Sequence, residues 1–375
     1  MRGVSRIVGL IIIYLPLSVK CQNVGRKEKA KHKDSSQDTV FEVGPLPDGF
    51  NDNPRGTKRI RVMFYNVENL FDNMDDPGKN DEEYLPGGIR NWSDYRYWNK
   101  QNAIARVIIA LGGWEAPEIV GLCEVENRKV LVDLVTKTAL KKVGYDIIHE
   151  ESPDLRGVDV ALLYRPEKFR PFRHQSIRLV FPFDTSAKTR DILLVSGKIL
   201  NQDTIHIFIN HWPSKFGGAK TTEPRRIFAA QKVRQVCDSL LKLNSQSKIL
   251  IIGDLNDEHF EPSIREGLKA FPVKEAKGWQ ELYNLSSEVK GGTHKFREHW
   301  HLIDHMIVSY GLLQGNKGFS VTSQSMKIFD APFLLVKDEI NLGYKPNRTY
   351  EGMRYNGGFA DHLPVYLDLI LKQEP

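Results

Sequence analysis

The 375-residue sequence is poor in cysteine and has no cysteine–histidine spacing of the kind that binds structural zinc. Its three cysteines are Cys21, Cys123 and Cys237, too few for a disulfide framework even in an exported chain. Cys123 and Cys237 are most simply small buried apolar residues. The sequence therefore predicts a fold stabilised by a hydrophobic core, which a chain of this length with 41% hydrophobic residues can form.

The motifs of several common enzyme classes are also missing. There is no glycine-rich phosphate loop of the nucleotide-binding kind and no G-x-S-x-G nucleophile motif. No internal repeat follows residue 60. Without an evident serine or cysteine nucleophile, attack by a metal-activated water is the reaction expected of an enzyme here.

The positive charge is confined to the start of the chain. Residues 1–60 hold 11 Lys and Arg against 6 Asp and Glu, so of the totals of 53 and 47 the rest of the chain carries 42 and 41. The part expected to fold is nearly neutral, and the net charge of +6 is no evidence for binding to nucleic acid. A local basic patch on the folded part remains an alternative.

The first 22 residues have the layout of a secretory signal peptide. A short basic segment precedes the apolar run 7–19, which is too short for a membrane-spanning helix. Cys21 stands where a bacterial lipoprotein signal carries its lipidated cysteine, but Lys20 replaces the small residue expected before it, so ordinary cleavage and lipidation both stay open. Residues 23–58 predict a flexible basic tether. We expect an exported protein that is periplasmic, anchored to the outer membrane or secreted, with membrane contact only through such an anchor.

From residue 59 to residue 372 the pattern predicts one α/β domain. Short segments rich in β-branched residues are expected to be strands: 59–65, 118–123, 158–164, 205–209, 248–252, 302–308 and 363–370. Apolar residues spaced by three and four predict helices at 95–111, 129–142 and 221–242. The mixture favours layers with mixed sheets rather than one parallel sheet. Residues 72–94 and 323–358 are expected to be surface loops near the functional face.

Polar residues follow almost every expected strand. In residues 248–257 (KILIIGDLND) an apolar run ends in Asp254, Asn256 and Asp257. Each such end could be an Asx turn, a solvated loop or a hydrogen-bonded structural histidine. Their recurrence favours a reaction centre, because strands fix the positions of polar groups that the adjoining loops carry. The carboxylates and amides are hard oxygen donors that suit Mg²⁺, or alternatively Mn²⁺ or Ca²⁺.

Six motifs in order resemble the endonuclease/exonuclease/phosphatase superfamily. They are 65–68 (YNVE), 122–124 (LCE), 210–214 (NHWPS), 253–256 (GDLN), 303–305 (IDH) and 360–364 (ADHLP). The group includes pancreatic deoxyribonuclease, abasic-site endonucleases, neutral sphingomyelinases and inositol polyphosphate 5-phosphatases. The resemblance spans residues 59–372 and implies a four-layer α/β sandwich, in which two mixed β-sheets pack face to face with flanking helices.

The resemblance also implies a metal site. It makes Glu124 the principal Mg²⁺ ligand, with Glu68 and Asp361 nearby. Asn66 supports these ligands and the phosphate. Some members carry Asp where this chain has Glu68, and many carry Ser where it has Ala360, so the geometry of the metal site is expected to differ.

The implied catalytic groups are histidines and carboxylates. Asp254 is expected to position and deprotonate water, and Asn256 to orient the water or the phosphate. His362 is expected to contact the phosphate, with Asp304 orienting its ring. His211 is expected to be a phosphate contact or the acid that protonates the leaving oxygen.

Three further residues are candidates for binding substrate: Ser214, Arg225 and Arg226. The two arginines could cradle a second phosphate or the leaving group, or they could be solvated charges in the first turn of a helix. Asp257 is expected to support the site residues from behind or to be a turn residue, without a catalytic role of its own.

The leading hypothesis is an exported metal-dependent phosphoesterase, a nuclease or phosphodiesterase that works by metal-assisted water attack. The alternatives are a phosphatase or phospholipase C-like enzyme acting on inositol, sugar or sphingolipid phosphates, and a non-catalytic binding module of the same fold. A calcium-stabilised structural site is a further alternative, although histidines add nothing for Ca²⁺. No obligate protein partner is implied, and the sequence does not choose between nucleic acid and small or lipid phosphate esters.

Overall fold

The structure is a computed structural model that describes residues 46–47, 50–315 and 317–372. The predicted signal peptide, with Cys21, and most of the predicted tether lie outside these residues. Among the residues described, no helix combines the length and hydrophobicity needed to cross a bilayer.

Two seven-stranded mixed sheets form the centre of the domain. The first contains, in spatial order, β14 (Gly318–Ser320), β20 (Val365–Lys372), β1 (Arg59–Leu70), β2 (Ile119–Val125), β4 (Asp159–Tyr164) and β3 (Asp146–His149), with β15 (Lys327–Ile328) paired to β20. The second contains β5 (Phe169–Ile177), β6 (Ile192–Ile199), β7 (Asp203–His211), β8 (Lys248–Asp254), β13 (Asp304–Ser309), β10 (Leu282–Asn284) and β9 (Ala270–Pro272). Only β1–β2, β7–β8 and β9–β10 pair in parallel among these strands.

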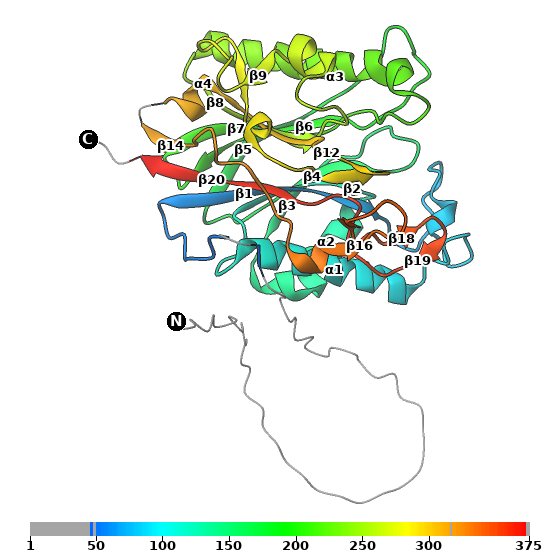
Figure 1. The fold of residues 1–375 in the computed structure, drawn as a ribbon. Helices are drawn as coiled ribbons and strands as arrows, with labels where there is room; N and C mark the ends of the chain where they lie inside the picture. Colours follow the sequence, from blue (N-terminus) through cyan, green and yellow to red (C-terminus); the bar gives the residue numbers. More distant parts are fainter. Residues whose placement is uncertain (1–45, 48–49, 316, 373–375) are drawn as a thin grey trace, which may run out of the picture.

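The helices cover the outer faces of the two sheets (Figure 1). The main helices are α1 (Asp94–Gly112) and α2 (Arg128–Lys137) against the first sheet, and α3 (Ala219–Leu243) against the second. Short helical turns are α4 (Tyr310–Leu313), η1 (Glu82–Tyr84), η2 (Ala139–Lys142), η3 (Ser263–Gly267), η4 (Leu285–Glu288) and η5 (Pro332–Leu334). The predicted helix 129–142 is interrupted at Thr138, whose backbone is extended, and it continues only as η2.

Three hydrophobic clusters lie between the four layers of the sandwich, which are the helices on one side, the two sheets and the helix on the other side. Along β1, Phe64 faces the cluster between the two sheets, while Met63 faces the cluster beneath α1 and α2. Along β8, Ile252 faces the inter-sheet cluster and Ile251 faces α3. Side chains of a strand point alternately to opposite faces, so each central strand contributes to two cores. The predicted α/β sandwich is confirmed.

The last residues of the predicted tether pack on the domain. The Arg55 side chain is fully buried, its Nε lies 3.0 Å from Glu118 Oε2, and its guanidinium donates to the carbonyls of Gly112, Glu115 and Ala116. Phe50 packs its ring 5.4 Å from that of Phe329. A buried charge needs such partners, so residues 50–58 belong to the folded domain rather than to a flexible tether.

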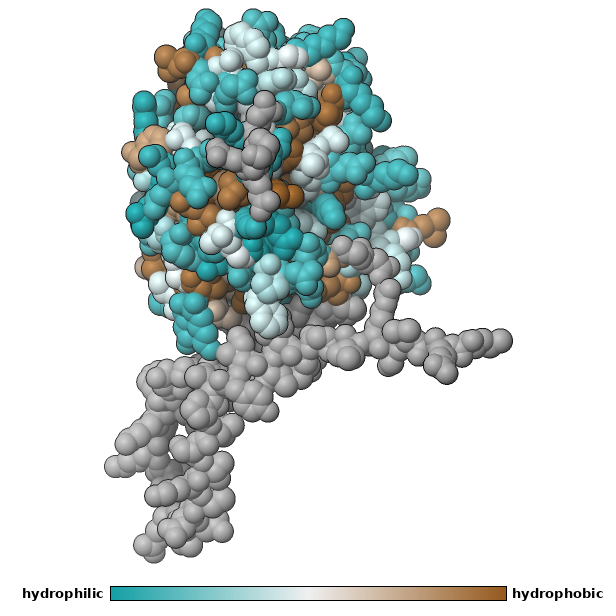
Figure 2. Space-filling model, turned by 90° about the vertical axis from the view of Figure 1, so that its left-hand side faces the viewer, coloured by the Kyte–Doolittle hydropathy of each residue, from teal (hydrophilic) through white to brown (hydrophobic). Residues whose placement is uncertain are grey.

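Of the two predicted loops, 72–94 contains only the helical turn η1 before α1, and 323–358 contains short hairpins. Residues 323–358 include β15, β16 (Leu335–Lys337), β17 (Tyr344–Pro346), β18 (Tyr350–Glu351) and β19 (Arg354–Tyr355), and the hairpin β11 (His294–Phe296) with β12 (His299–His301) precedes them. Figure 2 views the sandwich from the end where β20 finishes, and that face is mostly hydrophilic with apolar patches interspersed. The strand ends that carry the predicted site residues lie at the opposite end.

Candidate active site

Strand direction brings the polar strand ends to one end of both sheets. In the first sheet β1 and β2 run parallel, with Asn66 beside Cys123, and β20 runs antiparallel to β1, so it begins where β1 ends. In the second sheet His211 at the end of β7 pairs with Asp254 at the end of β8, and Asp254 pairs with Asp304 at the start of β13. Side chains far apart in the chain therefore converge.

Irregular backbone at the ends of β1 and β2 sets the direction of the side chains there. The pairing of β1 with β2 slips between Asn66 and Leu70, and that of β2 with β4 slips at Cys123 and Val125. Glu68 and Glu124, inside these bulges, have left-handed φ values of 52° and 63°. Non-glycine residues rarely adopt this conformation, and such strain gathers at functional sites.

A close approach of β7 and β8 also shapes the site. A Cβ atom on Gly253 would lie 2.5 Å from the carbonyl oxygen of Asn210, so only glycine fits there. This glycine lets β8 deliver Asp254 directly beside His211.

Asp254 lies at the centre of the converging groups. Its Oδ2 accepts a hydrogen bond from Asn66 Nδ2 at 3.1 Å, and its Oδ1 accepts one from the Asn256 amide at 2.9 Å. The Nε2 atoms of His211 and His362 lie 3.7 and 3.8 Å from the same Oδ2. Both histidines thus face the carboxylate at distances longer than a hydrogen bond.

His362 and Asp304 form a buried dyad. His362 Nδ1 lies 2.7 Å from Asp304 Oδ2, which fixes the ring and turns Nε2 toward Asp254. Asn256 is held separately, because its Nδ2 donates to the carbonyl of Trp212 at 3.0 Å. The structure brings together all five predicted catalytic residues in this arrangement; their chemical roles stay predictions.

The electrostatics of the two histidines are opposite. Burial, with Arg190 nearby, lowers the pKa of His211 well below its ordinary value. Burial would also lower the pKa of His362, but Asp304 and Asp254 outweigh it and hold that pKa well above the ordinary value. Burial raises the pKa of Asp254 to about 7. The site therefore combines a neutral imidazole, a cationic one and a carboxylate whose pKa lies near neutrality.

The oxygen atoms around Glu124 are suitable ligands for a hard divalent metal ion. Glu124 Oε2 accepts from the Asn69 amide at 2.9 Å, while Oε1 has only a long contact of 3.3 Å from Asn66 Nδ2 and lies 3.8 Å from His211 Nε2. The Glu124 side chain is 15% exposed, so one of its oxygens is available in a cluster of carboxylates and amides. Oxygen donors of this kind suit Mg²⁺.

A family model described as "Endonuclease/Exonuclease/phosphatase family" matches residues 61–371. The chain belongs to the endonuclease/exonuclease/phosphatase family. Membership supports a metal-dependent phosphoesterase in general terms, with a divalent metal as cofactor. No curated protein matches the chain.

Solved structures share the family fold at low sequence identity. TDP2 from Caenorhabditis elegans has 14% identity and a TM-score of 0.51, covering 85% of this chain and 76% of its own. The human Nocturnin catalytic domain with bound sulfate has 14% identity and a TM-score of 0.51, covering 84% and 95%. A family protein from Bacteroides vulgatus has 14% identity and a TM-score of 0.51, covering 84% and 99%.

Arg348 lies between Glu68 and Asp361, two of the three predicted metal ligands, and forms an ion pair with each of them. Its Nη2 lies 2.8 Å from Glu68 Oε1 and 3.0 Å from Asp361 Oδ2. Glu68, Glu124 and Asp361 are not one of the close groups of metal-ligating side chains among the described residues. Repulsion between Glu68 and Asp361 favours a cation between them, and in this chain an arginine supplies it. Arg348 lies in the loop 323–358, where no motif points to it.

Replacing Arg348 by methionine should tighten metal binding. The carboxylates of Glu68 and Asp361 would lose their charged partner and become free for an ion. At about 1.5–3 kcal/mol per charged hydrogen bond, this predicts a half-saturating Mg²⁺ concentration lower by at least about tenfold. Titrating Mg²⁺ against phosphodiester hydrolysis measures this. With substrate at saturation, Arg90→Met is the matched control for the half-saturating Mg²⁺ concentration, because Arg90 lines the same pocket but pairs with Glu83 at 2.8 Å. Weaker metal binding in Arg348→Met alone would show that Arg348 supports the ion.

Asn66, which is also predicted to bind the phosphate, lies in the cluster, whereas the three other predicted substrate residues lie beside it. Arg226 is buried, with its Nε 2.8 Å from Asp257 Oδ2, so this ion pair holds the start of α3 and gives Asp257 a structural partner. Arg225 pairs with Asp184. Ser214 is exposed and lines a pocket together with Arg225. Of the three, Ser214 and Arg225 keep a position from which substrate could be reached.

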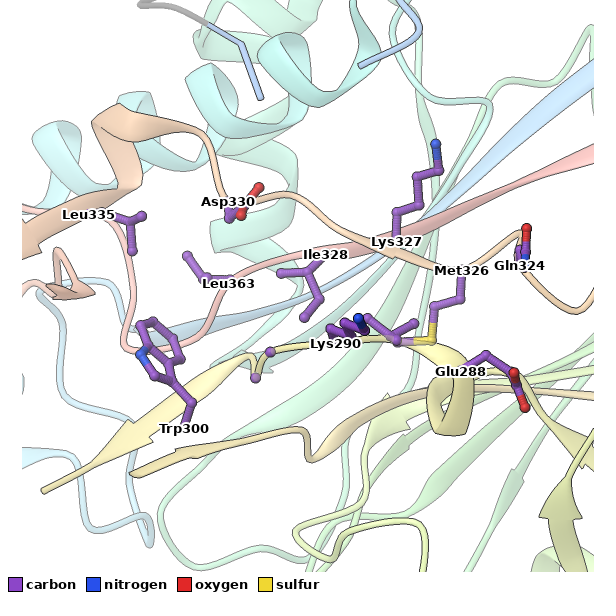
Figure 3. A pocket seen from close by; sticks show the side chains of 13 residues that line it. Glu288, Lys290, Trp300, Gln324, Met326, Lys327, Ile328, Asp330, Leu335 and Leu363 are labelled. Atoms are coloured by element: carbon purple, nitrogen blue, oxygen red, sulfur yellow. The ribbon is translucent and has the colours of Figure 1, made fainter. Parts of the chain in front are cut away.

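Two pockets flank the cluster, and a third lies apart from it. One of about 200 Å³ is lined by Glu68, Arg90, Arg348 and Tyr350, and one of about 320 Å³ by Arg156, Lys188, Arg190, Ser214 and Phe216. A larger pocket of about 580 Å³ runs from Trp300 and Leu335 to Met326 and Glu288 (Figure 3). None of the predicted site residues lines it, although Leu363 follows His362.

Proposed function

We propose that this protein is an exported, Mg²⁺-dependent phosphodiesterase of nuclease type. The observation that carries the proposal is the placement of Asp254 between His211 and the His362–Asp304 dyad, beside Glu124. A binding module of the same fold has no need for two histidines facing one carboxylate whose pKa is raised to about 7.

The residues have complementary roles in the proposed hydrolysis. Asp254 accepts the proton of the attacking water as its oxygen bonds to phosphorus. The Nε2 atoms of His211 and His362 hold the phosphate oxygens, and a histidine proton goes to the leaving oxygen as its bond to phosphorus breaks. Glu124, with Asn66 near it, would hold the Mg²⁺ ion, which supplies charge neutralisation at the phosphate.

The flanking pockets favour a diester over a monoester. A diester carries a substituent on each side of the phosphorus, and pockets with arginines and aromatic rings lie on both sides of the cluster. Arg90 stacks 5.1 Å from Tyr84 and 5.0 Å from Tyr350 in one pocket, and Phe216 is 92% exposed in the other. Arginines contact phosphates, and an exposed ring such as that of Phe216 can stack on a base, whereas Tyr84 and Tyr350 are themselves buried.

A substrate panel with and without EDTA tests the proposal. Bis(p-nitrophenyl) phosphate and plasmid DNA should be hydrolysed with Mg²⁺ and not with EDTA, and p-nitrophenyl phosphate, sphingomyelin and inositol phosphates should be hydrolysed more slowly. Hydrolysis confined to monoesters would make the protein a phosphatase. No hydrolysis of any of these substrates by the folded protein with any divalent metal would favour the binding module.

The proposed export rests on the layout of residues 1–22. Mass spectrometry of the mature N-terminus tests it: a chain that begins near Cys21, with or without lipid, supports export, and a mature chain that retains residues 1–22 contradicts it.

A further inference from the structure

A second group of metal-ligating side chains lies on the edge of the first sheet and does not include Asp254. His149 ends β3 and Asp159 begins β4, and the antiparallel register pairs His149 with Ala161. Extending that register by two residues puts Glu151 opposite Asp159. Positions two apart point to the same face of a sheet, so the strand pair itself directs the three side chains toward one point.

The ligand atoms of these three residues lie within 4.8 Å of one another. His149 Nε2 is 3.3 Å from Asp159 Oδ2, and their side chains are only 2% and 1% exposed. The contact between His149 Nε2 and Asp159 Oδ2 does not have the geometry of a hydrogen bond, and neither of these two atoms has another hydrogen-bond partner. The other oxygen of Asp159 is satisfied, because Oδ1 accepts from the Ser152 amide at 3.0 Å. Buried polar atoms left without partners are costly and rare.

A metal ion explains this geometry. For metal–nitrogen and metal–oxygen bonds of about 2.0–2.2 Å, two ligands of one tetrahedral ion lie about 3.4 Å apart and do not hydrogen-bond to each other. The group places the Glu151 and Asp159 carboxylates close together, and a bound cation would offset the repulsion between their charges. The hydrogen bonds of the Lys79 ammonium go to the carbonyls of Ser152 and Asp154, each at 3.1 Å, rather than to the two carboxylates.

We propose that His149, Glu151 and Asp159 form a second metal site that takes a transition-metal ion of the Zn²⁺ class. One imidazole and two carboxylates suit Zn²⁺, whereas Mg²⁺ avoids imidazole. Glu151 is exposed, so the fourth position opens to water. The site joins the ends of β3 and β4 and so holds the loop 150–158, which carries Asp154, Leu155 and Arg156 in the lining of the pocket near Ser214.

Zinc content after equilibrium dialysis in excess Mg²⁺ tests this site. The wild-type protein should retain one more equivalent of Zn²⁺ than His149→Ala or Glu151→Gln, and zinc should raise its Tm more than theirs. Any zinc bound near Glu124 is common to all the proteins and cancels in the difference. Glu151 is exposed, so Glu151→Gln decides the outcome if His149→Ala fails to fold.

The matched control is the neighbouring pair His174 and Glu150. His174 Nε2 lies 2.9 Å from Glu150 Oε1, both side chains are nearly half exposed, and they are not part of a close ligand group among the described residues. His174→Ala should keep the wild-type zinc content. Equal zinc content and equal affinity in the wild type, His149→Ala and Glu151→Gln would overturn the proposal.

Discussion

Replacing Asp254 by asparagine should lower kcat for phosphodiester hydrolysis by about 10²–10⁴-fold, the range that a positioned general base contributes. Asparagine keeps the shape of the side chain and one of the two oxygens that accept from Asn66 and the Asn256 amide, but it cannot accept the proton of the attacking water. Because the change removes a group needed only as the water is activated, KM should move little. Steady-state kinetics with bis(p-nitrophenyl) phosphate measure both constants.

The matched control for Asp254→Asn is Asp191→Asn. Asp191 is a buried carboxylate immediately before β6 of the same sheet, paired with Arg178 at 2.9 Å, and it is outside the cluster. That variant should lose some stability and keep the wild-type kcat per folded molecule. A wild-type kcat in Asp254→Asn would exclude Asp254 as the base.

Replacing Asp304 by asparagine should lower kcat by about 10²–10⁴-fold even though Asp304 need not touch substrate. Its carboxylate fixes the ring of His362 through Nδ1 and raises the pKa of that ring. Asparagine can present its amide group to Nδ1, which favours the wrong tautomer, and it removes the negative charge. The pKa of His362 should therefore fall, and an NMR titration of the ring measures the fall independently of activity.

Asp203→Asn is the control for Asp304→Asn. Asp203 pairs with Lys248 at 2.7 Å at the far end of the second sheet, so its loss leaves the His362 titration unchanged. If Asp304→Asn lost activity while the pKa of His362 stayed at the wild-type value, Asp304 would be a structural residue only.

The sequence predicted the strands that carry the site because each is an apolar run ended by turn formers. It missed β5 because this strand is largely exposed and polar, and it also missed β6, although that strand is apolar and buried along most of its length. It also placed residues 50–58 in the tether, because one arginine in a polar segment gives no pattern that distinguishes a buried ion pair from a solvated charge.

The convergence of Glu124, His211, Asp254 and His362 was predictable because the directions of paired strands decide which ends meet. The bulges that turn Glu68 and Glu124 into left-handed backbone were not, because they arise from a register slip between strands far apart in the sequence. Arg348 was missed for a related reason. It reaches Glu68 from a loop 280 residues away, and local sequence carries no trace of that contact.

The most direct test of the account is the Mg²⁺ dependence of bis(p-nitrophenyl) phosphate hydrolysis in the wild type and in Glu124→Gln. The wild type should show no hydrolysis in EDTA and should recover with Mg²⁺, and Glu124→Gln should lose at least about tenfold in metal affinity or rate because glutamine removes the charged oxygen. Hydrolysis that persists in EDTA, or a Glu124→Gln variant with the wild-type Mg²⁺ response, would contradict it.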